Sequence, residues 1–247
     1  MKVIACKTKK IVLGDNLFAI LDTYLPKLEE KTVVVITSKI ISICQENIIK
    51  NDGKTDKKKL VIKEADFYIE HDNEYGIVIP TIKNNVFLSN SGVDESNGNG
   101  DFILWPKNLE QTINEIWDYL RRKNNIKNLG VIVTDSRLIP LTFGLTGVAI
   151  GWCGFEAAQD YRGKADIFGR ELKMSQKNII NGLAGAAEVV MGEGSEQTPL
   201  GVITDIPNIV FQDRPPTIDE RNNLKIELKN DIFGKILNSV KWIKGGK

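Results

Sequence analysis

Two runs of β-branched residues stand out from the mixed pattern of apolar and polar positions along the chain. They are residues 32–37 (TVVVIT) and 130–134 (GVIVT), and both are typical of buried strands. Polar residues follow each run, Ser38 and Lys39 in the first case and Asp135 and Ser136 in the second. Because a rigid sheet often presents functional groups in the loops that follow its strands, we expect loops with chemical roles at both places.

Shorter runs predict three further strands between these two. They cover residues 60–69, 75–79 and 85–89, with turns at 72–73 and 84–85. The lysine run 57–59 lies beside Asp52, Gly53 and Asp56 and is expected to form a solvated loop.

Helical spacing of apolar residues appears in four places. The first is residues 17–24, which Pro26 ends, and the second is residues 113–120, followed by three basic residues that complement the helix dipole. The third is residues 177–191, whose small residues indicate close packing. The fourth begins at residue 218, after the pair Pro215-Pro216, and keeps an amphipathic pattern to residue 240. Strands mixed irregularly with helices predict an α+β fold.

Composition narrows the classes of partner. A formal net charge of +1 over 247 residues gives no electrostatic reason to expect nucleic acid or an anionic membrane. No apolar run approaches the length of a membrane span, and the apolar stretch at the N-terminus is too short for a signal peptide. The three cysteines lie far apart and suggest reduced thiols, so we expect a cytoplasmic protein.

The single histidine, His71, excludes zinc sites built on paired histidines and HExxH proteases. A Ser-His-Asp hydrolase would need His71 itself, which lies in an acidic turn. Any chemistry must therefore rely on carboxylates, lysine, arginine and backbone groups.

Three polar segments are candidates for that chemistry. Residues 90–101 form a loop rich in Asn and Gly that fails the EF-hand pattern, yet it offers oxygen ligands from Asp94 and Asn97; the alternative is a solvated turn. Asp135 follows a buried strand and could bind a metal, or it could cap a helix. Two glycines flank Glu193 and could turn backbone N–H groups toward an anion, or they could form a helix C-cap.

Acidic loops without histidine favour magnesium or manganese over zinc, and such ions commonly bridge polyphosphate oxygens. Lys39 could contact a phosphate, or it could be an ordinary solvated lysine. No Walker A motif and no Rossmann fingerprint occurs in the chain. The residues by themselves indicate a metal–nucleotide enzyme.

Five segments together resemble the coenzyme F420-0:L-glutamate ligases, in the family's order and with similar spacing. They are 92–97 (GVDESN), 131–135 (VIVTD), 144–151 (GLTGVAIG), 160–172 (DYRGKADIFGREL) and 191–194 (MGEG). The resemblance implies an F420-0:gamma-glutamyl ligase-like α+β fold with a ligase core at residues 1–205. Residues 206–247 lie outside it and are expected to form a helical C-terminal extension.

The resemblance also implies an activity: a GTP-dependent ligase, commonly a homodimer, that uses Mn²⁺ or Mg²⁺. Such an enzyme would phosphorylate an acceptor carboxylate, and the amine of L-glutamate would then displace phosphate. Asp94 and Asp135 would hold one ion and, with Lys39, act in catalysis, while Ser136 and Glu193 would help to hold a second. The expected GTP contacts are Ser38, Lys39, Asn97, Met191, Gly192, Glu193, Gly194, Ser195, Glu196, Gln197 and Thr198.

Two departures from the family pattern concern the acceptor. A second lysine of the family is lost, with Ile43 at its position, and Thr142 and Phe143 stand where paired arginines are usual. Fewer cations favour a folate over the more anionic F420-0, which leaves both as candidate acceptors. A phosphotransferase or nucleotide hydrolase using the same metal site, and a non-catalytic nucleotide-binding protein, remain alternatives.

Overall fold

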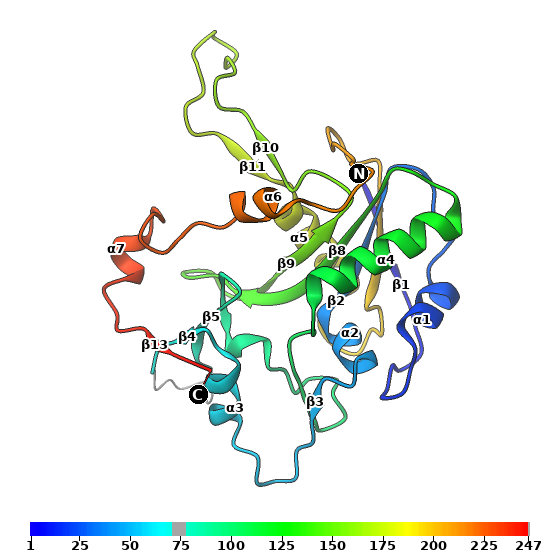
Figure 1. Cartoon of the computed structure of the whole chain (residues 1–247), viewed down its shortest axis with the longest axis vertical. Helices are drawn as coiled ribbons and strands as arrows, with labels where there is room; N and C mark the ends of the chain where they lie inside the picture. Colours follow the sequence, from blue (N-terminus) through cyan, green and yellow to red (C-terminus); the bar gives the residue numbers. More distant parts are fainter. Residues whose placement is uncertain (71–77, 247) are drawn as a thin grey trace.

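The computed structural model describes residues 1–70 and 78–246. Its centre is a five-stranded sheet with the order β1-β12-β2-β8-β9 (Figure 1). The strands are β1 (Lys2–Cys6), β12 (Leu200–Thr204), β2 (Thr32–Thr37), β8 (Leu129–Leu138) and β9 (Leu145–Cys153). β2 and β8 run parallel and the other neighbours antiparallel. Both strands predicted from the β-branched runs are confirmed, and they lie side by side.

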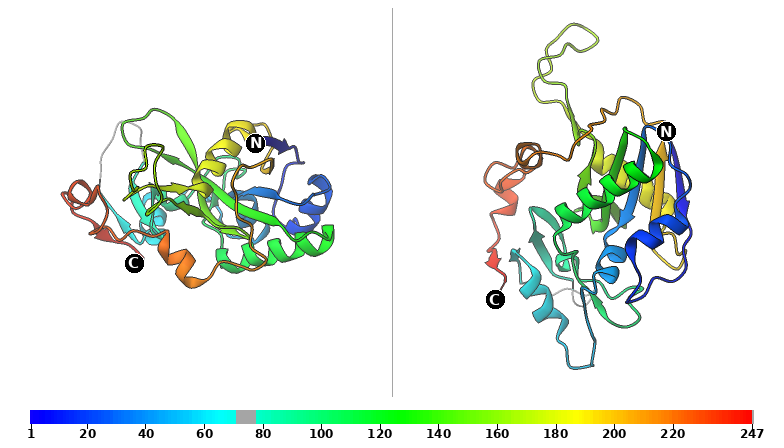
Figure 2. Two further views of the ribbon diagram at one scale, coloured as in Figure 1. Left: turned by 90° about the horizontal axis from the view of Figure 1, so that it is seen from above. Right: turned by 45° about the vertical axis from the view of Figure 1, so that its right-hand side comes forward.

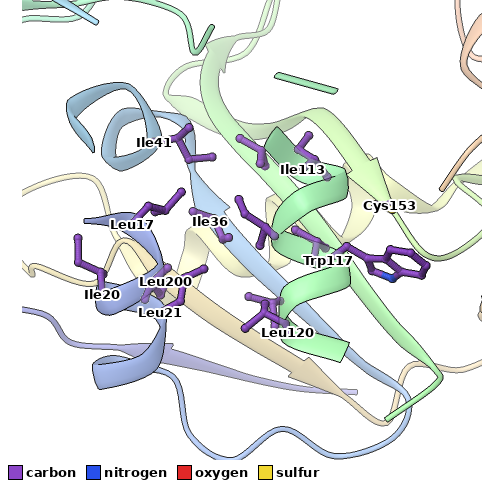
Figure 3. Packing of buried hydrophobic residues seen from close by; sticks show 14 of the residues in the cluster. Leu17, Ile20, Leu21, Ile36, Ile41, Ile113, Trp117, Leu120, Cys153 and Leu200 are labelled. Atoms are coloured by element: carbon purple, nitrogen blue, oxygen red, sulfur yellow. The ribbon is translucent and has the colours of Figure 1, made fainter. Parts of the chain in front are cut away.

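Helices cover both faces of this sheet. α1 (Leu17–Tyr24), α2 (Ser38–Cys44) and α4 (Leu109–Asn124) pack on one face, as Figure 3 shows for Trp117 and Leu120. α5 (Ile179–Met191) packs on the other. Alternate residues of β2 serve the two cores, Val34 toward α4 and Val35 toward α5, as a strand buried on both faces requires. The predicted helices 17–24 and 113–120 are confirmed, the second within the longer α4.

A second sheet has four strands in the order β13-β4-β5-β6. They are β13 (Ile243–Lys244), β4 (Phe67–Tyr68), β5 (Pro80–Lys83) and β6 (Val86–Ser89). The strand predicted at 85–89 and the turn at 84–85 are confirmed, because β5 and β6 form a hairpin there. The predicted turn at 72–73 and most of the strand at 75–79 lie outside the described residues.

The smaller elements complete the chain. β3 (Ile48–Ile49) pairs with β7 (Phe102–Ile103), and the 3₁₀ helix η1 (Asn90–Gly92) follows β6. β10 (Ala158–Asp160) and β11 (Gln176–Asn178) pair at the base of a hairpin that projects from the rest of the chain (Figure 1).

The strand predicted at 60–69 and the solvated loop at 57–59 are wrong. Residues Lys57–Glu64 form helix α3, and only the short β4 follows. The Asp56 carboxylate accepts from the backbone N–H of Lys59 at 3.2 Å, which caps the helix, and Leu60 and Val61 are buried beneath it. The lysine run therefore lies in the first turn of a helix, and the Asp56 cap favours this helix over the strand that the composition suggested.

Helix α5 starts at residue 179, two residues later than predicted, because residues 176–178 pair with β10 and Asn178 caps the helix. The helix predicted from residue 218 to 240 is confirmed only in the short helices α6 (Ile218–Asn223) and α7 (Gly234–Leu237); residues 224–233 between them are turns and irregular chain, and β13 then returns to pair with β4. The domain boundary at residue 205 stays a prediction. In residues 1–70 and 78–246, no helix combines the length and the apolar character that crossing a membrane requires.

Candidate active site

Three segments meet at one edge of the central sheet. β2 and β8 are parallel and pair from Thr32 and Leu129 to Thr37 and Thr134, so the end of β2 lies beside the residue just before Asp135 in β8. β12 runs antiparallel to β2 and begins at the same edge, where the backbone N–H of Thr37 donates to the carbonyl of Pro199 at 3.0 Å. This topology brings together the residues after 37, those around 135 and the loop 192–199.

Neither expected loop after these strands exists. Ser38 opens α2 directly, so Lys39 lies in the first turn of a helix. β8 runs on to Leu138 because Asp135 to Leu138 pair with Val148 to Leu145 of β9. Asp135 is therefore a strand residue, which rules out the helix N-cap.

Asp135 and Ser136, as successive strand residues, point to opposite faces of the sheet. Ser136 donates from its hydroxyl to the carboxylate of Glu193, in the loop after α5. Asp135 lies beside Gly92 of η1: a Cβ at Gly92 would come within 3.3 Å of its Oδ2. At this point one face of the central sheet contacts the segment around Gly92, and the other contacts the loop after α5.

Lys39 and Asp94 form an ion pair of 2.7 Å across this edge. The same ammonium donates to the hydroxyl and the carbonyl oxygens of Ser96, at 2.7 and 3.0 Å. Burial works against the charged form of Asp94, but the Lys39 ammonium and the Ser96 donors outweigh it and lower the pKa of the carboxyl. A plain solvated turn and a plain solvated lysine do not describe these two residues.

The loop after α5 folds back on itself. Met191 ends the helix and is buried, and Gly192, with a φ of 78°, forms the C-cap. The side chain of Asn97 donates to the carbonyl of Gly194 at 3.0 Å, which joins this loop to the loop that contains Asp94. The loop's own Glu196 accepts from the backbone N–H of Gly194 at 2.8 Å, so this N–H already faces a carboxylate.

The remaining predicted residues of this loop have smaller roles. Thr198 donates from its hydroxyl to the carbonyl of Met191, and Gln197 accepts from the backbone of Thr8 through its carbonyl at 2.8 Å. Ser195 is exposed.

Negative charge accumulates here. Burial, together with the charges of Asp94 and Glu193, raises the pKa of Asp135 to about 7. Burial and the neighbouring Glu193 raise the pKa of Glu188, in the last turn of α5, to about 8. Within the described part of the chain, the Oε1 of Glu188 is buried and has no hydrogen-bond partner. A crowded group of carboxylates with an unsatisfied oxygen suits a bound cation.

The arrangement is not a closed metal cage. Among the described residues, no three acidic, histidine or cysteine side chains are grouped closely enough to hold one ion by themselves. Ser136 and further oxygen donors would have to complete any coordination shell.

Sequence reasoning missed Glu188 by treating the helix at 177–191 as packing alone. The available signal was its position, three residues before Met191 and thus on the same helical face.

Comparisons with known proteins match one family over most of the chain. The F420-0:Gamma-glutamyl ligase family model matches residues 5–205. The chain is 34% identical to a coenzyme F420:L-glutamate ligase of Methanococcus maripaludis over 200 residues, which cover 75% of this chain and 80% of that protein. It is 34% identical over 190 residues to the ligase of the same name from Methanocaldococcus jannaschii, covering 76% and 74%. The corresponding protein of Methanopyrus kandleri is 31% identical over 208 residues, covering 77% and 81%.

Proposed function

The chain belongs to the F420-0:gamma-glutamyl ligase family, and we propose that it joins L-glutamate to a carboxylate of F420-0 or of a folate at the expense of GTP. The observation that supports this most strongly is the convergence of Lys39, Asp94 and Asp135 with the Ser136–Glu193 contact at one sheet edge. These residues come from four separate segments that the fold brings together.

The reaction we propose has two steps. A carboxylate oxygen of the acceptor attacks the γ-phosphorus of GTP. The bond between this phosphorus and the oxygen that bridges to the β-phosphate breaks, which releases GDP and forms an acyl phosphate on the acceptor. The amine of glutamate then attacks the acyl carbon. The bond between this carbon and the phosphate oxygen breaks, inorganic phosphate leaves, and the nitrogen loses a proton to give the amide. Lys39 would contact the phosphate oxygens, and its charge would oppose the negative charge that gathers during transfer.

We propose that two Mn²⁺ or Mg²⁺ ions belong to this site. Asp94 and Asp135 would hold one, and Ser136 and Glu193 would hold the other, with Glu188 close to both partners of that pair. Such ions neutralise phosphate charge during phosphoryl transfer. The closeness of these carboxylates supports this assignment, because burial and the charges of Asp94 and Glu193 raise the pKa of Asp135 and the charge of Lys39 opposes them.

The proposed GTP contacts lie on both sides of the edge. Ser38 and Lys39 start α2, and Asn97 holds the loop 192–198 through Gly194. In that loop, backbone N–H groups such as that of Gly194 would exchange the Glu196 carboxylate for a phosphate.

The proposal of a folate as acceptor is based on positively charged side chains that are usual in the family and absent from this chain. Ile43 is buried in α2 at the position where the family's second lysine is expected, and Thr142 and Phe143 lie in the exposed connection between β8 and β9. Because this protein has three fewer positive groups at these positions, the negative charge of a folate would be better compensated here than the larger negative charge of F420-0.

The test is mass spectrometry of purified protein with GTP, Mn²⁺ or Mg²⁺, glutamate and each acceptor. A mass increase of one glutamate residue, together with stoichiometric GDP, supports the proposal. GDP release that does not depend on glutamate would instead identify a phosphotransferase or nucleotide hydrolase. GTP binding without turnover on either acceptor would identify a nucleotide-binding protein.

A further inference from the structure

A groove of about 1040 Å³ lies between α4, β9 and the C-terminal segment. Pockets for small ligands commonly span about 300–1000 Å³, so this groove has room for a ring system and part of its side chain. α6 lies beside the start of α4 (Figure 2), where Arg221 contacts Asn114 and Glu110 at 3.4 and 3.5 Å. One wall of the groove therefore comes from residues beyond 205, where the family match ends.

The walls carry three tryptophans: Trp105, Trp117 and Trp152. The indole N–H groups of Trp117 and Trp152 donate to backbone carbonyls at 2.8 and 3.1 Å. Trp105 is different: its side chain is only 6% exposed, and its Nε1 is buried without a hydrogen-bond partner among the described residues. A buried donor left unsatisfied is costly, so this position calls for an acceptor atom from a ligand.

Trp105 also connects the groove to the sheet edge. A Cβ on Gly92 would lie 2.8 Å from Cε3 of Trp105 and 3.3 Å from Oδ2 of Asp135, so the indole and the carboxylate flank the same glycine. The Nε1 of Trp105 lies on the other side of the ring fusion from Cε3. One side of the indole thus borders Gly92 beside Asp135, while Trp105 also lines the groove.

The polar groups around the aromatic walls suit the edge of a heterocycle. Asn108, Gln111 and Asn114 supply amides, and the guanidinium of Arg221 lies 5.7 Å from the ring centroid of Trp152. Amides can pair with ring nitrogens and carbonyls, as can an indole N–H that has no other partner.

We propose that this groove binds the acceptor through its fused nitrogen-heteroaromatic ring, with the carboxylate to be extended directed toward Asp135. This inference rests on the proposed ligase function and adds the place of the ring and a role for the C-terminal segment. Trp105 and Arg221, which both line the groove, are its specificity-determining residues. A deazaflavin and a pterin share the required chemistry, so the experiment includes both.

The experiment measures binding of F420-0 and of folic acid by calorimetry to the full chain, with GDP and Mg²⁺ present. W105F keeps an aromatic ring and removes the N–H, and R221M keeps the side-chain length and removes the charge. We expect each to weaken binding of the preferred acceptor about tenfold, while GDP binding is unchanged. W242F is the control, because Trp242 packs on Phe87 and donates to the carbonyl of Leu237, away from the groove.

The tighter of the two acceptors in the wild-type protein identifies the ring. Wild-type affinity for both acceptors in W105F and R221M would overturn the groove assignment, even if the wild-type protein ligates glutamate. Binding that depends on Trp105 and Arg221, without any glutamate addition, would keep the groove and overturn the ligase function. A wild-type protein that binds neither acceptor would overturn the groove proposal.

Discussion

The Nζ of Lys39 lies 2.7 Å from the Oδ2 of Asp94 and joins the first turn of α2 to the loop after η1. The ammonium of Lys39 and the carboxylate of Asp94 thus each neutralise the charge of the other. A metal ion at Asp94 would compete with Lys39, and a phosphate at Lys39 would compete with Asp94. Binding of a metal–nucleotide complex satisfies both residues at once, whereas either ligand alone must break the ion pair.

Replacing Lys39 with methionine should therefore change metal binding and turnover in opposite directions. K39M leaves the Asp94 carboxylate unpaired, so Mn²⁺ should bind a few-fold more tightly in the absence of nucleotide. Turnover should fall by about 100-fold, the size of effect found when one donor to developing charge is removed. Calorimetry with Mn²⁺ and a GDP-release assay measure the two effects.

The matched control is K57M, since Lys57 pairs with Glu95 of the same loop at 3.1 Å. It should leave both measurements near wild type. Weaker Mn²⁺ binding in K39M, or full turnover, would contradict the competition between the two partners.

Substituting Asp135 should raise heat stability and abolish the response to metal. Burial and the charges of Asp94 and Glu193 disfavour the ionised form of Asp135, so D135N removes a charge that the metal-free fold opposes. Differential scanning calorimetry should show a higher Tm for metal-free D135N, by about 2–4 °C for each kcal/mol relieved. Added Mn²⁺ should raise the Tm of the wild type and leave D135N unchanged. D160N, which removes an exposed carboxylate, should respond to metal like the wild type; the same metal-induced shift in D135N would exclude Asp135 as a ligand.

Asn97 offers a way to test how the two nucleotide loops cooperate. Its side chain donates to the carbonyl of Gly194 at 3.0 Å, and its φ is 56°. Glycine accepts that backbone angle, so N97G removes the hydrogen bond without adding strain. One such bond contributes about 0.5–1.5 kcal/mol, so GTP affinity should fall by up to about tenfold. Asn99, with a φ of 54°, allows the same exchange in the same loop, and N99G should bind GTP like the wild type.

The sequence could predict those elements whose own pattern is decisive. The apolar runs of β2 and β8 and the helical stripe of α4 needed no knowledge of their neighbours. It could not predict that β8 continues through Asp135, because pairing with the exposed end of β9 extends the strand where its apolar pattern has stopped. It also missed α3, where the Asp56 cap outweighs a composition that suits a strand.

The candidate site divides in the same way. Asp94, Asp135 and Glu193 could be predicted as site residues because they lie in segments that occur in the order typical of the family. The position of Glu188 near the site depends on which face of α5 packs on the sheet. The role proposed for Trp105 depends on the C-terminal segment, which folds back and forms one side of the groove. Neither relationship is local in the sequence.

Gly92 should tolerate no side chain, for two separable reasons. Its φ is 69°, and a Cβ would lie 2.8 Å from the ring of Trp105. Alanine at a positive φ costs roughly 1–2 kcal/mol, and the overpacking adds about 1–3 kcal/mol. Gly100 has a φ of 92° and open space around its Cβ position, so G100A reports the backbone cost alone. Urea unfolding should show G92A to be the less stable variant, and G92A alone should weaken Mn²⁺ binding. Equal stabilities for the two variants would contradict the close approach of Trp105 to Gly92.

Glu220 should make the attachment of the C-terminal segment sensitive to acid. Its carboxylate accepts from both Nη atoms of Arg214, at 2.7 and 2.9 Å, and from the backbone N–H of Thr217 at 2.7 Å. Arg214 above all, and then the Thr217 and Gln212 donors, lower the pKa of Glu220 against the opposing effect of burial. A lowered carboxyl pKa stabilises the fold above its ordinary value of 4.5, and this stabilisation is lost as the pH falls toward the folded-state pKa.

Hydrogen exchange of amides 212–223 should therefore accelerate, relative to the central sheet, as the pH drops below about 4.5. E220Q should show up to about fivefold faster exchange of these amides already at pH 7, since it loses the charge that pairs with Arg214, worth up to about 1 kcal/mol. D219N removes the same charge from the same turn while leaving the Thr217–Glu220 capping box, and it should exchange like the wild type. Because α6 also carries Arg221 to the groove, E220Q should weaken acceptor binding together with the loss of protection. Unchanged exchange in E220Q at pH 7 would show that α6 is held by its other contacts instead.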